Sequence, residues 1–354
     1  MGATSSTRSY TSIVASVLDK VRDKVEDQIT RNNKLLYFYK KSGNMKKVSS
    51  GGDRYRVSLM YELAPADSYS NFSQIDVTPA DGITSAFFDW RQAAAAVSIS
   101  GLEDFKNRGS ERVFDLLKER TMQAVLGLED LFSKGLIQGQ AAIDSASTTT
   151  ARTSPINGSV FVDPLPLLVS YAGTGTIGGI VAGTETWWKN QSVDDSSSTF
   201  AGFLKALRNM YNLCSKGGGG SAGTPDLHLT NQDTFELYES ALAALHQNTS
   251  YVNADIPFQN IQFKGKPVIW DENVVDAKNA DVTPSGSDAG TWYMLNTNYL
   301  GLTVDSQHNF SVGDFVNPEN QDAKTALVLW YGTHWVSNRR KQGVLSGITT
   351  TTAA

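Results

Sequence analysis

The segment that decides the fold is residues 103–137, EDFKNRGSERVFDLLKERTMQAVLGLEDLFSKGLI. Its apolar side chains recur at the spacing of a helix with one buried face. A helix of about 30 residues is about 45 Å long, well above the usual three or four turns. Gly139 and a Ser/Thr-rich stretch at residues 145–153 end the pattern. The segment predicts a strut packed through Val113, Leu117, Ala124, Leu128 and Leu131.

Ahead of this helix, two extended segments are joined by a turn-rich excursion. After Gly51 and Gly52, apolar side chains stand at every second position, which is the period of a strand with one buried face. Residues 65–81 are turn-rich, and residues 83–99 form the second extended segment. The pattern predicts a long hairpin. Because a two-stranded hairpin is marginally stable in water, something else must cover its apolar residues. These are Tyr55, Val57, Leu59, Tyr61, Phe87 and Trp90.

Helices and strands are mixed beyond residue 160. Helical patterns cover residues 200–213 and 231–246, and strand patterns cover residues 263–270, 292–304 and 326–337. No repeat of fixed period occurs. The fold class predicted from this order is α+β.

Composition places the chain among ordinary globular proteins. It has 354 residues, of which 40% are hydrophobic and 19% charged. The single cysteine, Cys214, excludes an internal disulfide, and neither a secretory signal nor a membrane span is expected. The net charge is -5, but the first 47 residues carry ten basic and four acidic side chains. This basic end is either an arm that seeks a polyanion or an acidic neighbour, or a solvated helix face.

No motif predicts catalysis, a cofactor or a metal. Residues 173–178 match G-x-G-x-x-G, but the residues that follow are poor helix formers, so a glycine-rich turn is favoured over a dinucleotide site. Residues 217–220 lack the G-K-[ST] of a phosphate-binding loop. The four histidines are far apart in sequence and form no zinc motif. We therefore expect a protein that is not an enzyme.

Several strings resemble the major capsid proteins of tailed bacteriophages with the Hong Kong 97-like fold. They are residues 29–41 (ITRNNKLLYFYKK), 51–61 (GGDRYRVSLMY), 83–109 (ITSAFFDWRQAAAAVSISGLEDFKNRG), 229–239 (LTNQDTFELYE), 263–271 (FKGKPVIWD), 292–300 (WYMLNTNYL) and 338–344 (NRRKQGV). The resemblance implies an N-terminal arm at 1–48, an extended E-loop hairpin at 49–99 and a peripheral P-domain with a spine helix at 100–160. An axial A-domain at 161–325 and a return to the P-domain with a C-terminal tail at 326–354 complete it.

The resemblance also implies the function. The chain is expected to assemble as hexamers and pentamers into the icosahedral shell of a virion, inside the bacterial host cytoplasm, around double-stranded DNA bound non-specifically at the inner face. A portal and a separate scaffolding protein are expected partners, because no helical extension of ~100 residues precedes the arm. No lysine lies in residues 65–81, which favours a shell without covalent crosslinks. The alternatives are a tail or decoration subunit and, from another class, a nucleotide-binding cytosolic enzyme.

The same resemblance assigns roles to three sets of residues. The apolar residues of the hairpin, Tyr55, Val57, Leu59, Tyr61, Phe87 and Trp90, are expected to contact a neighbouring subunit. The basic arm is expected to make contacts through Arg22, Lys24, Arg31, Lys34, Lys40 and Lys41. The spine helix is expected to pack through Val113, Leu117, Leu128 and Leu131.

Overall fold

The chain folds into two compact units. The computed structural model describes residues 34–49, 51–64, 66–74, 78, 81–106, 116–138, 162–195, 199–217, 223–244, 261–274, 290–319 and 321–348. The smaller unit includes Ala95–Gly127 and Val312–Val328, and the larger unit includes Asn32–Ala94, Leu128–Ser311 and Leu329–Ala354.

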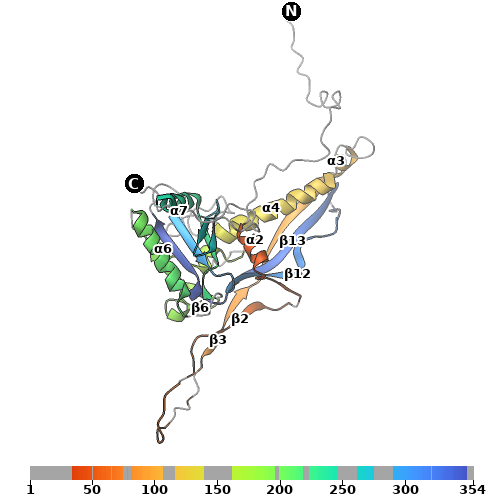
Figure 1. The fold of residues 1–354 in the computed structure, drawn as a ribbon. Coiled ribbons are helices and arrows are strands. Elements are labelled where there is room, and N and C mark those ends of the chain that lie inside the picture. The colour runs from red at the N-terminus through yellow and green to blue at the C-terminus, as the bar shows by residue number, and fades with distance from the viewer. Residues whose placement is uncertain are drawn as a thin grey trace, which may run out of the picture. The chain divides into compact units, whose positions relative to one another are not determined.

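A six-stranded sheet forms the main core of the larger unit (Figure 1). Its order is β7-β14-β11-β8-β10-β9. β14 runs parallel to β7, and β10 runs parallel to β8, whereas the other neighbours are antiparallel. The last strand that the structure describes therefore lies inside the sheet, between β7 and β11. The strands are β7 (Gln191–Asp194), β8 (Leu227–Thr230), β9 (Ile261–Phe263), β10 (Lys266–Trp270), β11 (Gly290–Leu295) and β14 (Gly343–Ile348).

Helices α6 (Phe200–Ser215) and α7 (Gln232–Ala244) pack on this sheet, as Figure 1 shows. The Thr199 hydroxyl caps α6 by accepting the Gly202 N–H at 3.3 Å. Both helices bury their apolar stripes against Trp292 of β11, whose ring lies 6.2 Å from Phe203 and 5.2 Å from Tyr238. The two helices that the sequence predicted in this region are confirmed.

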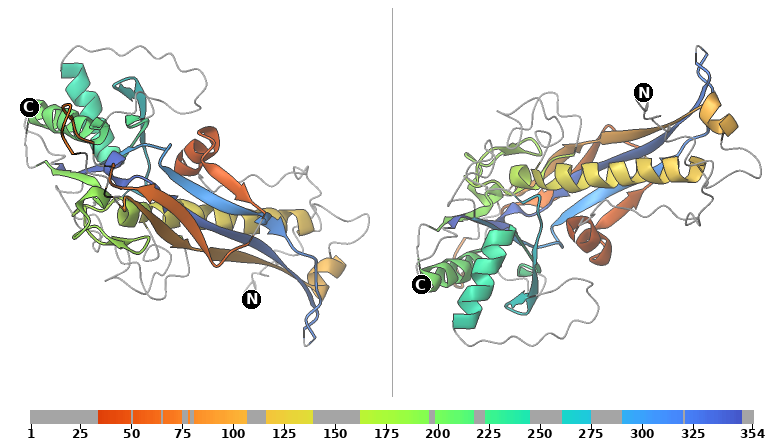
Figure 2. Two further views of the ribbon diagram at one scale, coloured as in Figure 1. Left: turned by 90° about the horizontal axis from the view of Figure 1, so that it is seen from below. Right: turned by 90° about the horizontal axis from the view of Figure 1, so that it is seen from above.

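A second sheet has four strands in the order β1-β12-β13-β4. In the larger unit, the C-terminal half of α4 (Leu116–Gln138) covers one of its faces, and Figure 2 shows the helix lying along the strands. Phe132 carries this packing, with its ring 4.3 Å from Trp330 and 5.6 Å from Phe310. The strands are β1 (Met45–Val48), β4 (Arg91–Ser100), β12 (Leu300–Val312) and β13 (Ala323–Val336).

The N-terminal end of the described chain belongs to the larger unit. Helix α2 (Lys34–Lys41) buries Leu35 and Tyr39, and the Tyr39 hydroxyl lies 2.8 Å from Nε2 of His334. β1 pairs in parallel with β12, from Met45 beside Leu302 to Val48 beside Asp305. Within the predicted arm at 1–48, residues 34–48 pack into the core of the larger unit and extend the sheet that contains β12.

The predicted hairpin is present as β2 (Arg54–Met60) and β3 (Ile83–Asp89). Seven residue pairs join the strands in antiparallel register, from Arg54 beside Asp89 to Met60 beside Ile83. The second extended segment divides at Trp90, so that β3 belongs to the hairpin and β4 to the four-stranded sheet.

The glycine-rich segment forms a small ribbon of β5 (Thr176–Ile177) and β6 (Ile180–Val181), followed by the short helix η3 (Thr186–Trp188). A strand that opens directly into a long helix, which a dinucleotide site needs, does not occur at residues 173–188. The nucleotide alternative is therefore wrong for this segment. Two further short helices, α5 (Leu165–Leu168) and η5 (Arg339–Lys341), lie in the larger unit.

The smaller unit holds α3 (Gly101–Lys106) and the first half of α4. Ser100 and Glu103 cap α3 reciprocally, because each side chain accepts the other's backbone N–H at 3.3 Å. Glu103 also lies 3.6 Å from Arg120 of α4. The predicted long helix is thus helical at both ends, while residues 107–115 lie outside the described residues.

Both larger sheets join strands from different expected domain segments. β12 was placed in the A-domain segment, but it pairs with β1 in the four-stranded sheet. β14 was placed in the return to the P-domain, but it lies inside the six-stranded sheet. Local patterns cannot reveal such exchanges, because they arise from pairing between strands that are distant in sequence.

Candidate assembly surfaces

The inner face of hairpin β2–β3 packs against its own chain. The Tyr55 ring lies 5.9 Å from Trp335 and 6.1 Å from Trp90, and Leu59 is buried. Val57 is half-buried in the same row. This subunit already covers Leu59, so little of its side chain is left for the expected contact with a neighbouring subunit, which stays a prediction. Tyr55 and Trp90 are likewise engaged within the chain.

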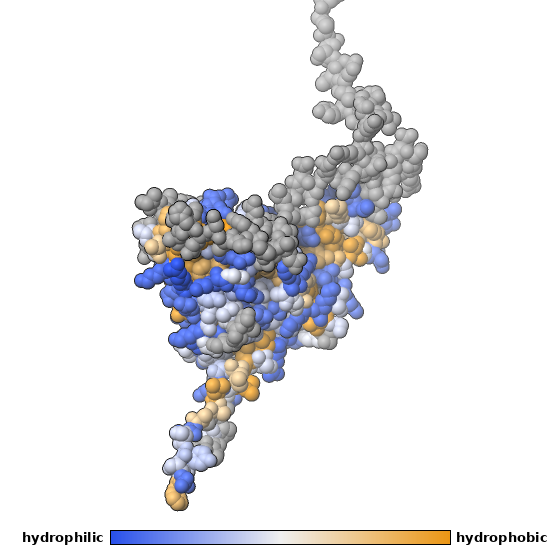
Figure 3. Space-filling view, in the orientation of Figure 1, coloured by the Kyte–Doolittle hydropathy of each residue, from blue (hydrophilic) through white to orange (hydrophobic). Residues whose placement is uncertain are grey.

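The outer face of the hairpin carries apolar residues that the chain leaves uncovered. Figure 3 shows hydrophobic residues near the base of the hairpin and at its far end. Met60 and Ile83 are cross-strand partners and are 71% and 70% exposed. Phe87, one of the six expected contact residues, is also exposed on this face, whereas Tyr61 is in phase with the inner row and stacks on Trp187 of the same chain. Most of the exposed apolar surface of the hairpin therefore lies on the face opposite to the alternating row of Tyr55, Val57 and Leu59.

The tip of the hairpin adds three more apolar side chains. Leu63 is 77%, Tyr69 71% and Phe72 fully exposed. A short turn presents Phe72, since the Ser73 N–H donates to the Ser70 carbonyl at 2.9 Å and the two hydroxyls lie 3.0 Å apart. Large apolar side chains gathered on one projecting element are typical of a surface that another molecule covers.

The smaller unit has an exposed apolar set of its own. Gly101 holds its start together, because its N–H donates to the Asp322 carbonyl at 2.9 Å and a Cβ there would meet the Asp322 carboxylate at 2.2 Å. Several large apolar side chains of this unit are exposed, and sequence patterns gave no signal for them. They are Leu102, Phe105, Met122, Val312, Phe315, Val316 and Leu327.

The basic residues assigned to the arm fall into three groups. Arg22, Lys24 and Arg31 lie outside the described residues. Lys40 and Lys41 are exposed in the last turn of α2, where positive charge favours the helix dipole.

Lys34 is buried, and its expected role as an arm contact stays a prediction. Its Nζ donates to the Trp270 carbonyl and lies 4.0 Å from the centroid of the Trp270 ring. Burial lowers the pKa of Lys34, and the nearby carboxylates of Asp271 and Glu272 oppose that shift. The ammonium group therefore serves the subunit's own packing.

The expected spine residues are described only in part. Val113 and the side chain of Leu117 lie outside the described residues. Leu128 is buried and Leu131 is half-buried, both in the half of α4 that belongs to the larger unit.

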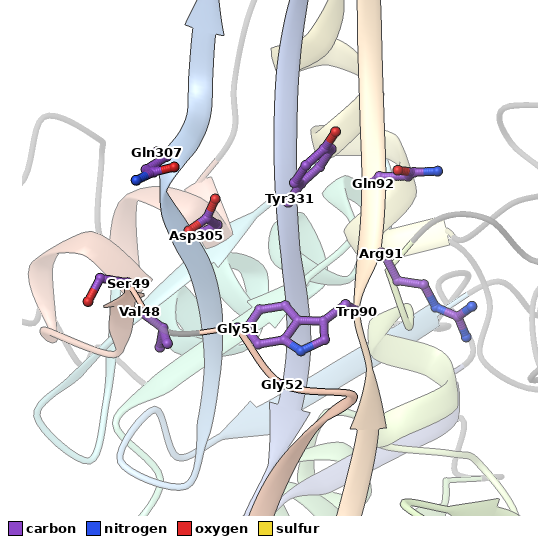
Figure 4. Close-up of a pocket in the computed structure, with 10 residues that line it drawn as sticks. All are labelled: Val48, Ser49, Gly51, Gly52, Trp90, Arg91, Gln92, Asp305, Gln307 and Tyr331. Atoms are coloured by element: carbon purple, nitrogen blue, oxygen red, sulfur yellow. The ribbon is translucent and has the colours of Figure 1, made fainter.

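A pocket of about 470 Å³ opens in the larger unit beside the start of the hairpin (Figure 4). Trp90 and Tyr331 give it aromatic walls and Asp305 lies on the facing strand, whereas the Arg91 side chain points away from the pocket and lies 4.0 Å from Asp163. Asp305 lies 2.5 Å from Nδ1 of His308, and this hydrogen bond lowers the pKa of the carboxyl. The His308 ring stacks on Tyr331 at 4.4 Å. The other residues that line the pocket are Val48, Ser49, Gly51, Gly52, Gln92 and Gln307.

Burial shifts the pKa of several titratable side chains so that each is uncharged at neutral pH. Burial lowers the pKa of His228 to about 3 and that of His334 to about 4, so both rings are neutral at pH 7. Burial raises the pKa of the Cys214 thiol to about 12, which leaves it protonated. Among the described residues, no group of three or more His, Cys, Asp or Glu side chains could hold a metal ion. None of the helices described in the chain is long and apolar enough to cross a bilayer.

No protein-family model matches the sequence, and no curated protein matches it. Solved structures, in contrast, match almost the whole chain. The capsid asymmetric unit of cyanophage A-1(L) gives a TM-score of 0.60 with 13% identity, over 94% of this chain and 97% of that chain. The capsid of an empty GTA particle gives 0.58 with 10% identity, over 94% and 95%. The holo-SrpI encapsulin complex from Synechococcus elongatus PCC 7942 gives 0.57 with 11% identity, over 97% of each chain.

At these identities the likeness concerns the fold. The chain has the α+β, Hong Kong 97-like fold that the sequence resemblance implied. The match extends over nearly the full length of the similar chains, so hairpin, sheets and long helix belong to one shared architecture.

Proposed function

We propose that the protein is the major capsid protein of a tailed bacteriophage. Copies of it assemble as hexamers and pentamers into an icosahedral shell that encloses double-stranded DNA. The fold and the coverage of capsid chains from a cyanophage and a GTA particle support this proposal. The protein acts by binding itself, not by catalysis.

The observation that carries the proposal is the exposed apolar surface of hairpin β2–β3. Fully burying a side chain such as Leu63 or Phe72 is worth roughly 1.5–3 kcal/mol, and the subunit leaves both uncovered. A second copy is the natural partner, because closed symmetric oligomers reuse the same contact at every position.

Parts of the fold receive roles within this proposal. We assign the six-stranded sheet with α6 and α7 to the A-domain, and the four-stranded sheet with α4 to the P-domain. Hairpin β2–β3 with its tip is the E-loop, and the residues before Lys34 are the arm. Arg22, Lys24 and Arg31, with Lys40 and Lys41, supply its positive charge. A separate scaffolding protein and a portal complete the assembly in the host cytoplasm, and the packaged DNA is held without sequence specificity.

One rival proposal has a specific observation in its favour. The encapsulin complex matches the chain over the same length as the phage capsids do, so a shell around a protein cargo is the second candidate. A tail or decoration subunit has less support, because the chain covers nearly the whole of the capsid chains. Nuclease-protected DNA in particles from infected cells would favour the phage head, and a co-purified protein cargo would favour the second candidate.

The test of shell formation is a loop replacement. In one variant, a short Gly/Ser linker replaces residues 65–81, and in another, serine replaces Leu63, Tyr69 and Phe72. Each protein is co-expressed with the phage's scaffolding protein and examined by sedimentation velocity and electron microscopy. Wild type should form closed shells. Both variants should melt cooperatively as subunits but fail to form shells.

The matched control changes three polar residues of the same loop, Ser68, Asn71 and Gln74, to glycine. This control should assemble as wild type does. Normal shells from the triple serine variant would contradict the role of the hairpin tip in contacts between subunits. Flat sheets in place of closed shells from wild type would contradict the proposed shell function.

A further inference from the structure

Both strands of the hairpin are held by one short segment of the larger unit. The Phe87 N–H in β3 donates to the Gly178 carbonyl at 3.0 Å. On the other strand, the Tyr61 ring stacks on Trp187 with centroids 5.1 Å apart and planes 19° apart. Residues 173–188 therefore grip the hairpin from two sides just where it leaves the body.

The grip at Gly178 requires glycine for two separate reasons. Its φ is +62°, in the left-handed region that other residues rarely adopt. A Cβ at this position would also lie 2.7 Å from the Ala86 Cβ. The next residue, Gly179, has φ of +82° but open space where its Cβ would be. Both glycines have a positive φ, but only Gly178 has a neighbour where a Cβ would lie. A comparison of substitutions at the two positions therefore distinguishes the effect of backbone strain from the effect of close packing.

The gripping segment is itself pinned to the body. Trp188 is buried, and its Nε1–H donates to the Ile177 carbonyl at 3.0 Å. The buried Arg339 guanidinium donates to the carbonyls of Leu168 and Trp188 at 2.9 and 3.3 Å and to the Asn190 Oδ1 at 3.0 Å. Leu168 and Asn190 stand on either side of residues 173–188, and Trp188 is the last residue of that segment. Arg339 therefore fixes both ends of the segment beside the start of β14.

We propose that residues 173–188 form a clamp that fixes the direction of hairpin β2–β3 on the free subunit, so that the hairpin meets a second copy already oriented. This inference rests on the proposed shell function for its partner. A two-stranded ribbon alone is only marginally ordered, and ordering it during association would reduce affinity. The clamp removes that cost before the subunits meet. A glycine-rich linker that merely connects two elements would leave the hairpin unaffected by changes within it.

The experiment uses the full-length chain as dissociated subunits, with Gly178→Ala compared with Gly179→Ala. Hydrogen exchange is followed for the amides of residues 54–60 and 83–89. Gly178→Ala should raise exchange in the hairpin by at least tenfold, because the added Cβ forces the ribbon away from Ala86 and breaks the bond to Phe87. Gly179→Ala should leave hairpin exchange within about twofold of wild type, although its backbone strain is similar.

A second pair of variants tests the clamp even if the Gly178→Ala protein does not fold. Trp187 is only half-buried, so Trp187→Ala should fold and should also raise hairpin exchange, whereas Trp187→Phe should restore most of the protection by keeping an aromatic ring against Tyr61. Folded Trp187→Ala and Gly178→Ala subunits with wild-type hairpin exchange would overturn the clamp.

Assembly rates separate the clamp from the function on which it rests. With the scaffolding protein present, Gly178→Ala and Trp187→Ala should assemble at least tenfold more slowly than Gly179→Ala. If hairpin hydrogen exchange rises in Gly178→Ala and Trp187→Ala but the wild-type protein forms no shells, the result would support the clamp and contradict the proposed function. Loosened hairpins that assemble at the wild-type rate would overturn the claim that the clamp serves assembly.

Discussion

Strands β11 and β2 are of similar length, yet the chain covers them very differently. β11 buries all six of its residues, whereas β2 buries one of its seven. β11 lies inside a sheet with helices α6 and α7 packed on it, while β2 belongs to a ribbon with one face on the body. The comparison teaches that the subunit completes its core in one region and leaves apolar surface uncovered in the other. The body should therefore govern stability and the hairpin should govern association.

The largest effect is expected where a charge enters the body. Leu128→Asp would place a carboxylate in a fully buried position of α4, at a cost of several kcal/mol, comparable with the whole stability of a domain. We expect no soluble, protease-resistant subunit. Gln123→Asp, at an exposed position of the same helix, should fold normally. Limited proteolysis and circular dichroism measure the difference, and a folded Leu128→Asp protein would refute the burial of this face.

The next effect concerns the buried guanidinium that links the body to the clamp. Arg339→Leu removes three hydrogen bonds and leaves their acceptors unpaired, which should destabilise the subunit by about 3–5 kcal/mol. Burial lowers the pKa of Arg339 to about 10, so it remains charged at neutral pH. The control is Arg340→Leu, at the exposed neighbouring position, which should change the melting temperature little. Equal melting temperatures for the two variants would contradict the prediction.

A smaller, pH-dependent effect should come from His334 in the body. Burial holds its pKa at about 4, below the 6.5 of an unfolded chain, so its contribution to stability is present above pH 6.5 and is lost as the pH falls toward 4. His334→Gln should therefore lose stability less steeply over this range, by about 1.4 kcal/mol per pH unit. Urea unfolding at several pH values measures both slopes, and parallel slopes would disprove the assignment.

Asp163 acts in the opposite direction over part of that range. Burial raises the pKa of its carboxyl to about 6, while Arg91 opposes the shift. The folded state therefore holds this proton more tightly, and the contribution is present below pH 3.8 and lost as the pH rises through 6. The comparison of His334→Gln with wild type cancels this background, because Asp163 is present in both proteins.

The smallest effect on the subunit, and the sharpest test of the comparison, is expected at the hairpin tip. Phe72→Ser should change the free energy of unfolding by no more than about 0.5 kcal/mol, since Phe72 is fully exposed. Shell formation should nevertheless weaken, whereas Gln74→Ser in the same loop should affect neither quantity. Calorimetry and sedimentation velocity provide the two readouts. A destabilised Phe72→Ser subunit would show that the tip belongs to the subunit's own core.

Local periodicity predicted the hairpin and the long helix, because both are read from residues close in sequence. It could not place β14 or β12, whose partners are set by pairing across long separations. Charge gave no sign that Lys34 is buried, since the sequence does not reveal that Trp270 covers its ammonium group. The glycine-rich segment was correctly expected to be a turn, but its contact with Ala86 depends on the tertiary fold.

The hairpin residues expected to contact a neighbouring subunit stay a prediction, and the apolar residues that the subunit leaves most exposed lie mainly outside the alternating row. Alternation marks the apolar row that packs somewhere, and in β2 that row packs on the subunit itself through Tyr55 and Leu59. The surface left for a neighbour consists of apolar residues that break the alternation, such as Met60 and Phe72. A search for apolar side chains out of phase with the buried row would have found them.

The interior position of β14 also sets the order in which the hairpin and the six-stranded sheet can form during translation. The hairpin ends at Asp89, but the six-stranded sheet cannot close until Gly343–Ile348 has left the exit tunnel. At about 5–20 residues per second, roughly 10–50 s separate these events. During that interval the nascent chain carries its apolar hairpin without a finished body. A chain that stalls before Gly343 stays open at the gap between β7 and β11, where proteases can reach it.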